Sequence, residues 1–91
     1  MREINEIDSP ILGEVVDEIV DHLTLKLQAK GTEAFSSSHE IYGIIAEEVS
    51  ELLEAVKLND KEELELELKD IIVAGIWGLA SLKQGEALWS R

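Results

Sequence analysis

The chain has 91 residues, of which 45% are hydrophobic and none is cysteine; this excludes disulfides, Cys-ligated metal sites and a disordered protein, and indicates one domain over residues 1–91. Twenty acidic residues against eight basic ones give a net charge of −12, which argues against nucleic acid or an anionic membrane as a partner. The first ten residues carry no apolar signal segment and the longest apolar stretch is too short to cross a bilayer, so we expect a cytoplasmic protein.

The first predicted helix covers about residues 11–30. Ser9 is a favourable N-cap residue, Pro10 suits the first helical position, and Gly31 suits a left-handed C-terminal cap. Apolar residues recur at helical spacing and form one stripe, as in an amphipathic helix: Leu12, Val15, Val16, Ile19, Val20, Leu23 and Leu27.

A turn-rich loop over residues 31–38 leads to the second predicted helix, over about residues 39–58. Its apolar side is formed by Ile41, Ile44, Ile45, Val49, Leu52, Leu53, Ala55 and Val56. At about 100° of rotation per residue, Glu48 falls inside this apolar side, Glu51 lies at its edge, and Glu47 points to the opposite side, toward water. Two acidic side chains are therefore predicted to point where a core should be.

The third predicted helix covers about residues 61–83, and Asp60 followed by Glu63 resembles a capping box at its start. From residue 71 onward this helix is apolar almost all round, which predicts a central position or a subunit interface. Glu67 and Asp70 share one side of it with small residues that leave room for a ligand or for a close helix approach. These small residues are Ala74, Gly78 and Ser81.

Together these elements predict an all-α fold, a compact bundle of three long helices, with residues 84–91 unassigned. A chain of this length buries a small core, so additional stability must come from elsewhere. We expect oligomerisation to complete a four-helix-type bundle, in a homodimer or a homotetramer.

Four inward-facing carboxylates form the predicted site: Glu48 and Glu51 on the second helix, and Glu67 and Asp70 on the third. Unpaired buried carboxylates are costly, so they must be protonated, meet lysines or hold a cation. Octahedral oxygen coordination suits Mg²⁺, with Mn²⁺ as the alternative ion. The pattern therefore predicts a metal site, and surface charge alone is the competing interpretation.

The same residues carry a family resemblance. Glu47, Glu48 and Glu51 form an EExxE motif, and Glu67 and Asp70 form an ExxD motif after a spacer. This pattern resembles the MazG-like nucleotide pyrophosphohydrolases, the all-α NTP pyrophosphatase superfamily, over about residues 39–83. The resemblance implies cleavage of a (d)NTP to a (d)NMP and pyrophosphate, with Glu48, Glu51, Glu67 and Asp70 as Mg²⁺ ligands. It implies a catalytic pair of Glu48 and Glu47, in which Glu47 is an accessory acid that orients the attacking water.

Two alternatives remain at this point. Phosphoribosyl-ATP pyrophosphohydrolase has a similar acidic pattern, but Ile45 and Ala46 stand where we would expect a lysine. A non-enzymatic helical protein with an acidic surface for a binding or regulatory partner is the other alternative. A Ser/His/Asp triad is not indicated, because neither His22 nor His39 has evident partners in the sequence.

Five further residues are candidates for contacts to the nucleoside triphosphate substrate: Lys26, Lys30, His39, Tyr42 and Trp77. Lys26 and Lys30 could reach the triphosphate, although lysines in a last turn also complement a helix dipole. Trp77 lies two turns beyond Asp70 and could stack on a base, although it could equally belong to the core or an interface. His39 and Tyr42 precede the acidic motif and could contact base or sugar.

Overall fold

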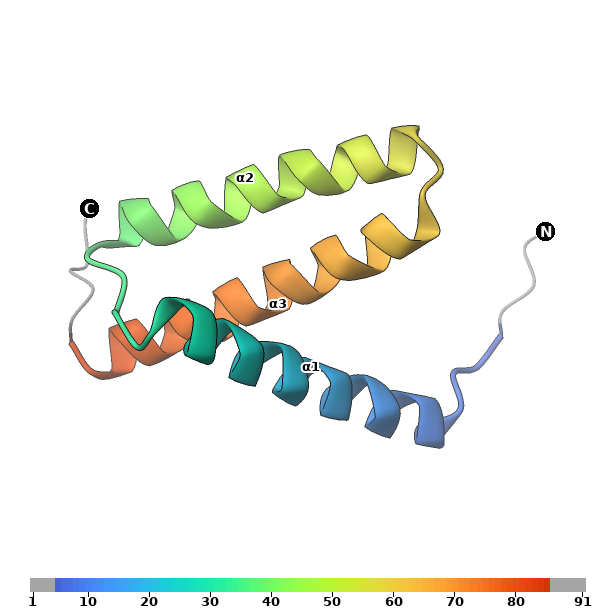
Figure 1. The fold of residues 1–91 in the computed structure, drawn as a ribbon, viewed down its shortest axis with the longest axis horizontal. Coiled ribbons are helices and arrows are strands. Elements are labelled where there is room, and N and C mark those ends of the chain that lie inside the picture. The colour runs from blue at the N-terminus through green and yellow to red at the C-terminus, as the bar shows by residue number, and fades with distance from the viewer. Residues whose placement is uncertain (1–4, 86–91) are drawn as a thin grey trace.

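The computed structural model describes residues 5–85, which fold into three α-helices: α1 (Ser9–Lys30), α2 (Ser38–Lys57) and α3 (Lys61–Lys83). In Figure 1, α2 and α3 form an antiparallel hairpin, and α3 lies between α2 and α1. The all-α prediction is confirmed, and the helix bounds differ from the predicted ones by two residues or fewer. None of the described helices is long and apolar enough to span a membrane.

Local capping interactions define the helix starts. The Ser37 hydroxyl accepts from the Glu40 N–H at 3.1 Å, and Asp60 Oδ1 accepts from the Glu63 N–H at 3.1 Å, so the predicted cap at Asp60 is present. The predicted cap at Ser9 is wrong, because the Asp8 carbonyl already accepts from the N–H of residue 11 and Ser9 is the first helical residue. Gly31 has the expected positive φ of 77°, but its ψ of −159° lies outside the left-handed helical region.

A tight turn and a close helix approach make the α2–α3 hairpin. Asn59 adopts a positive φ of 55°, which asparagine tolerates better than most residues, and Asp60 then starts α3. Further along, a Cβ atom at Gly78 would lie 3.1 Å from the Ile41 side chain. Gly78 therefore allows α2 to approach α3 closely, which is one of the two roles that its small size indicated.

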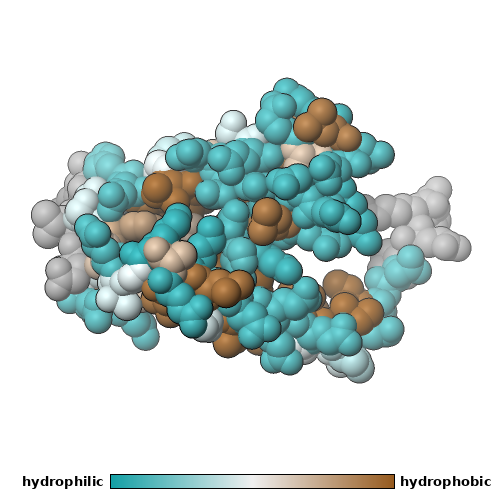
Figure 2. All heavy atoms as spheres, in the orientation of Figure 1, coloured by the Kyte–Doolittle hydropathy of each residue, from teal (hydrophilic) through white to brown (hydrophobic). Residues whose placement is uncertain are grey.

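The apolar stripe of α1 is largely exposed. Ile19 is its one buried residue, whereas Leu12 and Val16 retain 52% and 60% of their accessible surface. Figure 2 shows hydrophobic side chains at the surface along α1. The apolar stripe of α1 predicted a buried face, but most of its side chains stay exposed within this chain. The reason is that α1 packs against α3 alone, and a stripe this wide needs a second neighbouring element.

We propose that a second copy of the chain covers this face of α1. The exposed stripe is continuous with buried Ile19, and few apolar side chains in the described chain are buried: Ile19, Ala55, Val73 and Ala74. So small a core supplies little stability for a domain of this size. A second copy would supply this missing burial permanently, which favours a copy of the same chain over an occasional partner.

Static light scattering at micromolar concentration is expected to give the mass of a homodimer or a homotetramer. The double variant Leu12→Glu/Val16→Glu should shift this mass toward the monomer and lower the thermal midpoint, because it places charges in the buried interface. Asp17→Lys, on the polar side of α1, serves as the control. A monomeric wild-type chain would contradict the proposal.

Candidate metal centre and adjoining pocket

Three carboxylates from two helices meet between α2 and α3. Glu48 comes from α2, while Glu67 and Asp70 lie three residues apart on α3 and so share one face of it. Each of the three offers one oxygen atom, and these oxygens all lie within 4.8 Å of one another. Glu67 is buried, with 7% of its surface exposed, and the other two are half-buried. This carboxylate cluster (Glu48, Glu67 and Asp70) is therefore compact enough to hold one metal ion.

The cluster lacks compensating donors for two of its oxygens. Oε2 of Glu48 and Oε2 of Glu67 are both buried, and neither accepts a hydrogen bond from a described residue. Buried acceptors without a partner are costly, because water no longer solvates them. A divalent cation would satisfy both oxygens at once, so the donor set fits a hard, oxygen-preferring metal ion.

Burial and crowding change the acidity of the cluster. Burial raises the pKa of Glu67 to about 7, helped by the close carboxyl groups of Glu48 and Glu51 and by their negative charges. Burial also raises the pKa of Glu48, supported by the charges of Asp70 and Glu51, while the proximity of the Glu67 carboxyl group and the charge of Lys26 oppose the rise. Below about pH 7, a proton on Glu67 therefore limits the negative charge of the cluster when no cation is bound.

Helix α1 supplies positive charge on one side of the cluster. His22 Nε2 lies 2.7 Å from Asp70 Oδ1, and Lys26 Nζ lies 3.4 Å from the same oxygen. The His22 contact was not predicted from sequence, although one signal was available. His22, Lys26 and Lys30 are spaced four residues apart, so the three basic side chains share one face of α1 in a strongly acidic protein.

The two remaining acids of the EExxE motif lie outside the cluster. Glu51 is exposed and is not among the three grouped residues, but it is close enough to Glu67 to raise the pKa of that side chain. Glu47 is exposed on the outer side of α2, as its helical phase predicted. The metal-ligand role predicted for Glu51 and the catalytic role predicted for Glu47 both stay predictions.

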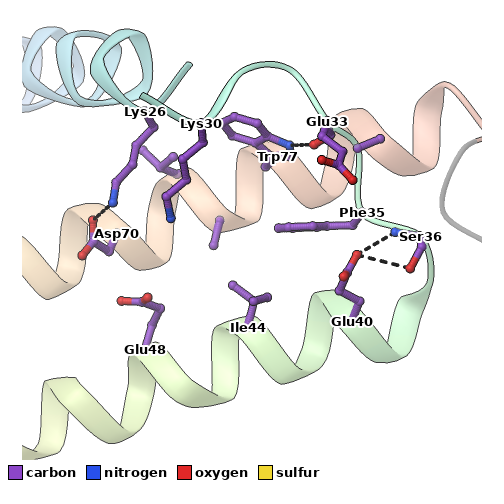
Figure 3. A pocket seen from close by; sticks show the side chains of 13 residues that line it. Lys26, Lys30, Glu33, Phe35, Ser36, Glu40, Ile44, Glu48, Asp70 and Trp77 are labelled. Carbon is purple, nitrogen blue, oxygen red and sulfur yellow. Dashed lines mark hydrogen bonds and ion pairs between the residues drawn. The ribbon is translucent and has the colours of Figure 1, made fainter. Parts of the chain in front are cut away.

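A pocket of about 430 Å³ opens beside the cluster (Figure 3). Glu48 and Asp70 line one end of it, and Lys26 and Lys30 reach into it from α1. Its walls continue through Ile44 and Trp77 to the loop that connects α1 with α2. This volume lies within the range of small-molecule sites, and the arrangement places cations next to the cluster, where an anionic ligand would be stabilised.

Of the other residues predicted to contact substrate, one lines the pocket and two do not. Trp77 lines the pocket, and its Nε1 donates to the carbonyl of Glu33 at 2.7 Å. His39 and Tyr42 are exposed and are not among the residues that line the pocket. Phe35, which sequence reasoning could not assign because it lies in a loop without periodicity, also lines the pocket and donates its N–H to the Ser81 hydroxyl at 3.0 Å.

The sequence pattern of the MazG nucleotide pyrophosphohydrolase domain matches residues 36–86, more than half of the chain. The chain belongs to this family. No match to a curated protein or to a solved structure accompanies this one. The matched region includes α2, α3 and the whole carboxylate cluster, whereas α1 with its three basic residues precedes it. The MazG resemblance inferred from the acidic motifs is therefore confirmed.

The raised pKa of Glu67 predicts a pH-dependent stability in the absence of divalent cations. Between pH 4.5 and about 7 the folded chain holds a proton on Glu67 that the unfolded chain has lost, so this group lowers the free energy of unfolding as the pH rises. Above about pH 7 the loss is complete. In urea denaturation with EDTA, Glu67→Gln is therefore expected to be more stable than wild type at pH 8 and to converge with it toward pH 5.

Glu65→Gln, an exposed acid on the same helix, is the matched control and should follow the wild-type curve. A stability difference between Glu67→Gln and wild type that is the same at pH 5 and pH 8 would contradict the assignment of the raised pKa to Glu67.

Proposed function

We propose that the protein is a Mg²⁺-dependent nucleoside triphosphate pyrophosphohydrolase that converts a (d)NTP and water to a (d)NMP and pyrophosphate. The observation that supports this most directly is the buried carboxylate cluster, which opens onto a pocket containing two lysines. Membership of the MazG nucleotide pyrophosphohydrolase domain family supports the same reaction class.

The donor set favours Mg²⁺, with Mn²⁺ as the alternative. All three clustered ligands are carboxylate oxygens, with no cysteine in the chain and with the nearest histidine engaged by Asp70. Hard oxygen donors suit Mg²⁺ and Mn²⁺ better than softer transition metals. When bound, such an ion neutralises phosphate charge and lowers the pKa of a water molecule, which is the chemistry that hydrolysis of a phosphoanhydride requires.

The residues of the chain divide the remaining tasks. Glu48, Glu67 and Asp70 hold the ion, and the contact from His22 fixes the orientation of the Asp70 carboxylate. Lys26 and Lys30 offset the negative charge of the triphosphate at the cluster end of the pocket. Glu51, which is close to Glu67, contributes a further ligand from the edge of the cluster. The family motif assigns to Glu47 the orientation of the attacking water, although this side chain is exposed on the outer side of α2.

A non-enzymatic acidic binding protein is less well supported by this geometry. A surface that binds a basic partner needs exposed charges, whereas Glu67 is buried and two cluster oxygens are without donors. Burial of charge at this free-energy cost is typical of sites that bind an ion or carry out chemistry.

Metal binding should appear as thermal protection. At pH 8, millimolar Mg²⁺ or Mn²⁺ is expected to raise the unfolding midpoint of wild type by several degrees, since a ligand at about 100 times its Kd adds about 2.7 kcal/mol. Glu67→Gln should abolish most of this shift, and Glu62→Gln, an exposed acid outside the pocket, should retain it. An equal shift in both variants would place metal binding elsewhere.

Catalysis should depend on the same cluster. Glu48→Gln and Asp70→Asn are expected to reduce pyrophosphate release from (d)NTPs by at least about 100-fold, because each removes a charged ligand from the ion. Their helical circular dichroism should match that of wild type, since neither change adds a buried charge. Glu54→Gln, on the exposed side of α2, is the control. Undiminished turnover in either cluster variant would reject the assigned ligands.

A further inference from the structure

The pocket has two chemically different ends. At one end the carboxylate cluster lies next to Lys26 and Lys30, as Figure 3 shows. At the other end the lining residues with charged side chains are both acidic: Glu33 from the connecting loop and Glu40 from the first turn of α2. We refer to this second end as the acidic end of the pocket.

We propose that the acidic end selects nucleobases with an exocyclic amino group at C4 of a pyrimidine or C6 of a purine, so that the enzyme prefers cytosine and adenine nucleotides over uracil, thymine and hypoxanthine nucleotides. This inference rests on the proposed function, because it takes the substrate to be a nucleotide with its phosphates at the cluster. It adds a substrate class that neither the acidic motifs nor the metal centre determines.

The spacing of the two ends matches a nucleotide. Glu40 and Glu48 are eight residues apart on α2, which corresponds to about 12 Å along the helix axis. With the phosphates beside Glu48, Lys26 and Lys30, this separation places the base near Glu40. Residues of both ends line this same pocket, so one ligand can contact them together.

Aromatic side chains lie between the two ends. Phe35 from the connecting loop and Trp77 from α3 both line the pocket, and Figure 3 shows them between the lysines and Glu40. The loop that carries Phe35 is tied to α3 twice, through the Trp77 bond to the Glu33 carbonyl and the Phe35 bond to Ser81. A base can therefore pack against a preorganised apolar surface, with its polar edge directed to the acidic end.

The Glu40 carboxylate is held in a defined position. Its Oε1 accepts from the Ser36 N–H at 2.7 Å and lies 3.4 Å from the Ser36 hydroxyl. The Glu40 N–H donates in turn to Ser37, so the acid is fixed at both its backbone and its side chain. A carboxylate has two oxygens with about four lone-pair sites, so acceptor capacity remains after the Ser36 contacts.

The selectivity follows from this acceptor character. Cytosine and adenine present an N–H donor at the 4- and 6-amino groups, whereas uracil, thymine and hypoxanthine present a carbonyl oxygen at the same positions. At this exocyclic position a carboxylate can accept from the amino group, whereas it repels the carbonyl oxygen. An acceptor opposite an acceptor leaves both unpaired, which favours the amino-bearing base.

Matched nucleotide pairs test this directly. Isothermal titration of the full chain with CMP against UMP, and with AMP against IMP, compares bases that differ only in the exocyclic amino or carbonyl group and in the proton on the adjacent ring nitrogen. We expect the amino-bearing member of each pair to bind about tenfold more tightly. The kcat/KM for pyrophosphate release should show the same order for CTP over UTP and for ATP over ITP.

Glu40→Gln separates base selection from a structural role of Glu40. Its amide oxygen can still accept from the Ser36 N–H, which keeps the helix start, while its NH₂ group now donates. We expect this variant to lose the preference for CMP over UMP or to reverse it, with unchanged helical circular dichroism. Glu62→Gln, which lies outside the pocket, should keep the wild-type preference.

Equal affinities within both nucleotide pairs, or an unchanged preference in Glu40→Gln, would overturn the amino-group proposal. In that case continued pyrophosphate release from the triphosphates would leave the proposed function standing. If no triphosphate is hydrolysed and no monophosphate binds, the proposed function fails and this inference fails with it.

Discussion

The structure depends on the burial of acidic side chains between α2 and α3. Carboxylates that are removed from water without full compensation oppose folding, and here three of them converge within 4.8 Å. This cost is offset partly by the contacts of His22 and Lys26 with Asp70, and partly by the raised pKa of Glu67, which favours its uncharged form below about pH 7. Two buried oxygens without donors remain uncompensated, and this is the feature that fits the proposed binding of a cation. The negative charge that opposes folding is thus the same charge that the proposed cation would neutralise.

Helix α1 supplies the positively charged side chains that lie next to the carboxylate cluster. It lies outside the region that matches the MazG domain, yet it contributes the basic face of His22, Lys26 and Lys30. An ion pair between Lys69 Nζ and Glu18 Oε1, at 3.2 Å, also joins α3 to α1. The same helix exposes apolar side chains along its stripe. Its position therefore affects both the charge of the pocket and the surface available to a second copy of the chain.

The pocket is asymmetric because different elements build its two ends. The cluster end is assembled from the middle of the helices, where register determines which side chains meet. The acidic end is built from the connecting loop and the first turn of α2, which hydrogen bonds to Ser36, Ser81 and Trp77 hold in place. The pocket therefore changes in chemistry from the carboxylate cluster and its lysines, through the aromatic side chains, to the acidic end. In the proposed complex the phosphates lie at the cluster end and the base at the acidic end.

Helical periodicity was sufficient to predict the three helices, and helical phase placed Glu48, Glu67 and Asp70 on inward-facing sides. Periodicity and the cap at Asp60 depend on residues that are close in the sequence, so a single sequence contains the information that determines them. The exposed stripe of α1, the place of Glu51 outside the cluster, the contact of His22 with Asp70 and the position of Phe35 were decided by tertiary structure. Periodicity defines which face a residue occupies on its own helix, but the crossing of α1 over α3 determines which neighbour, if any, covers that face.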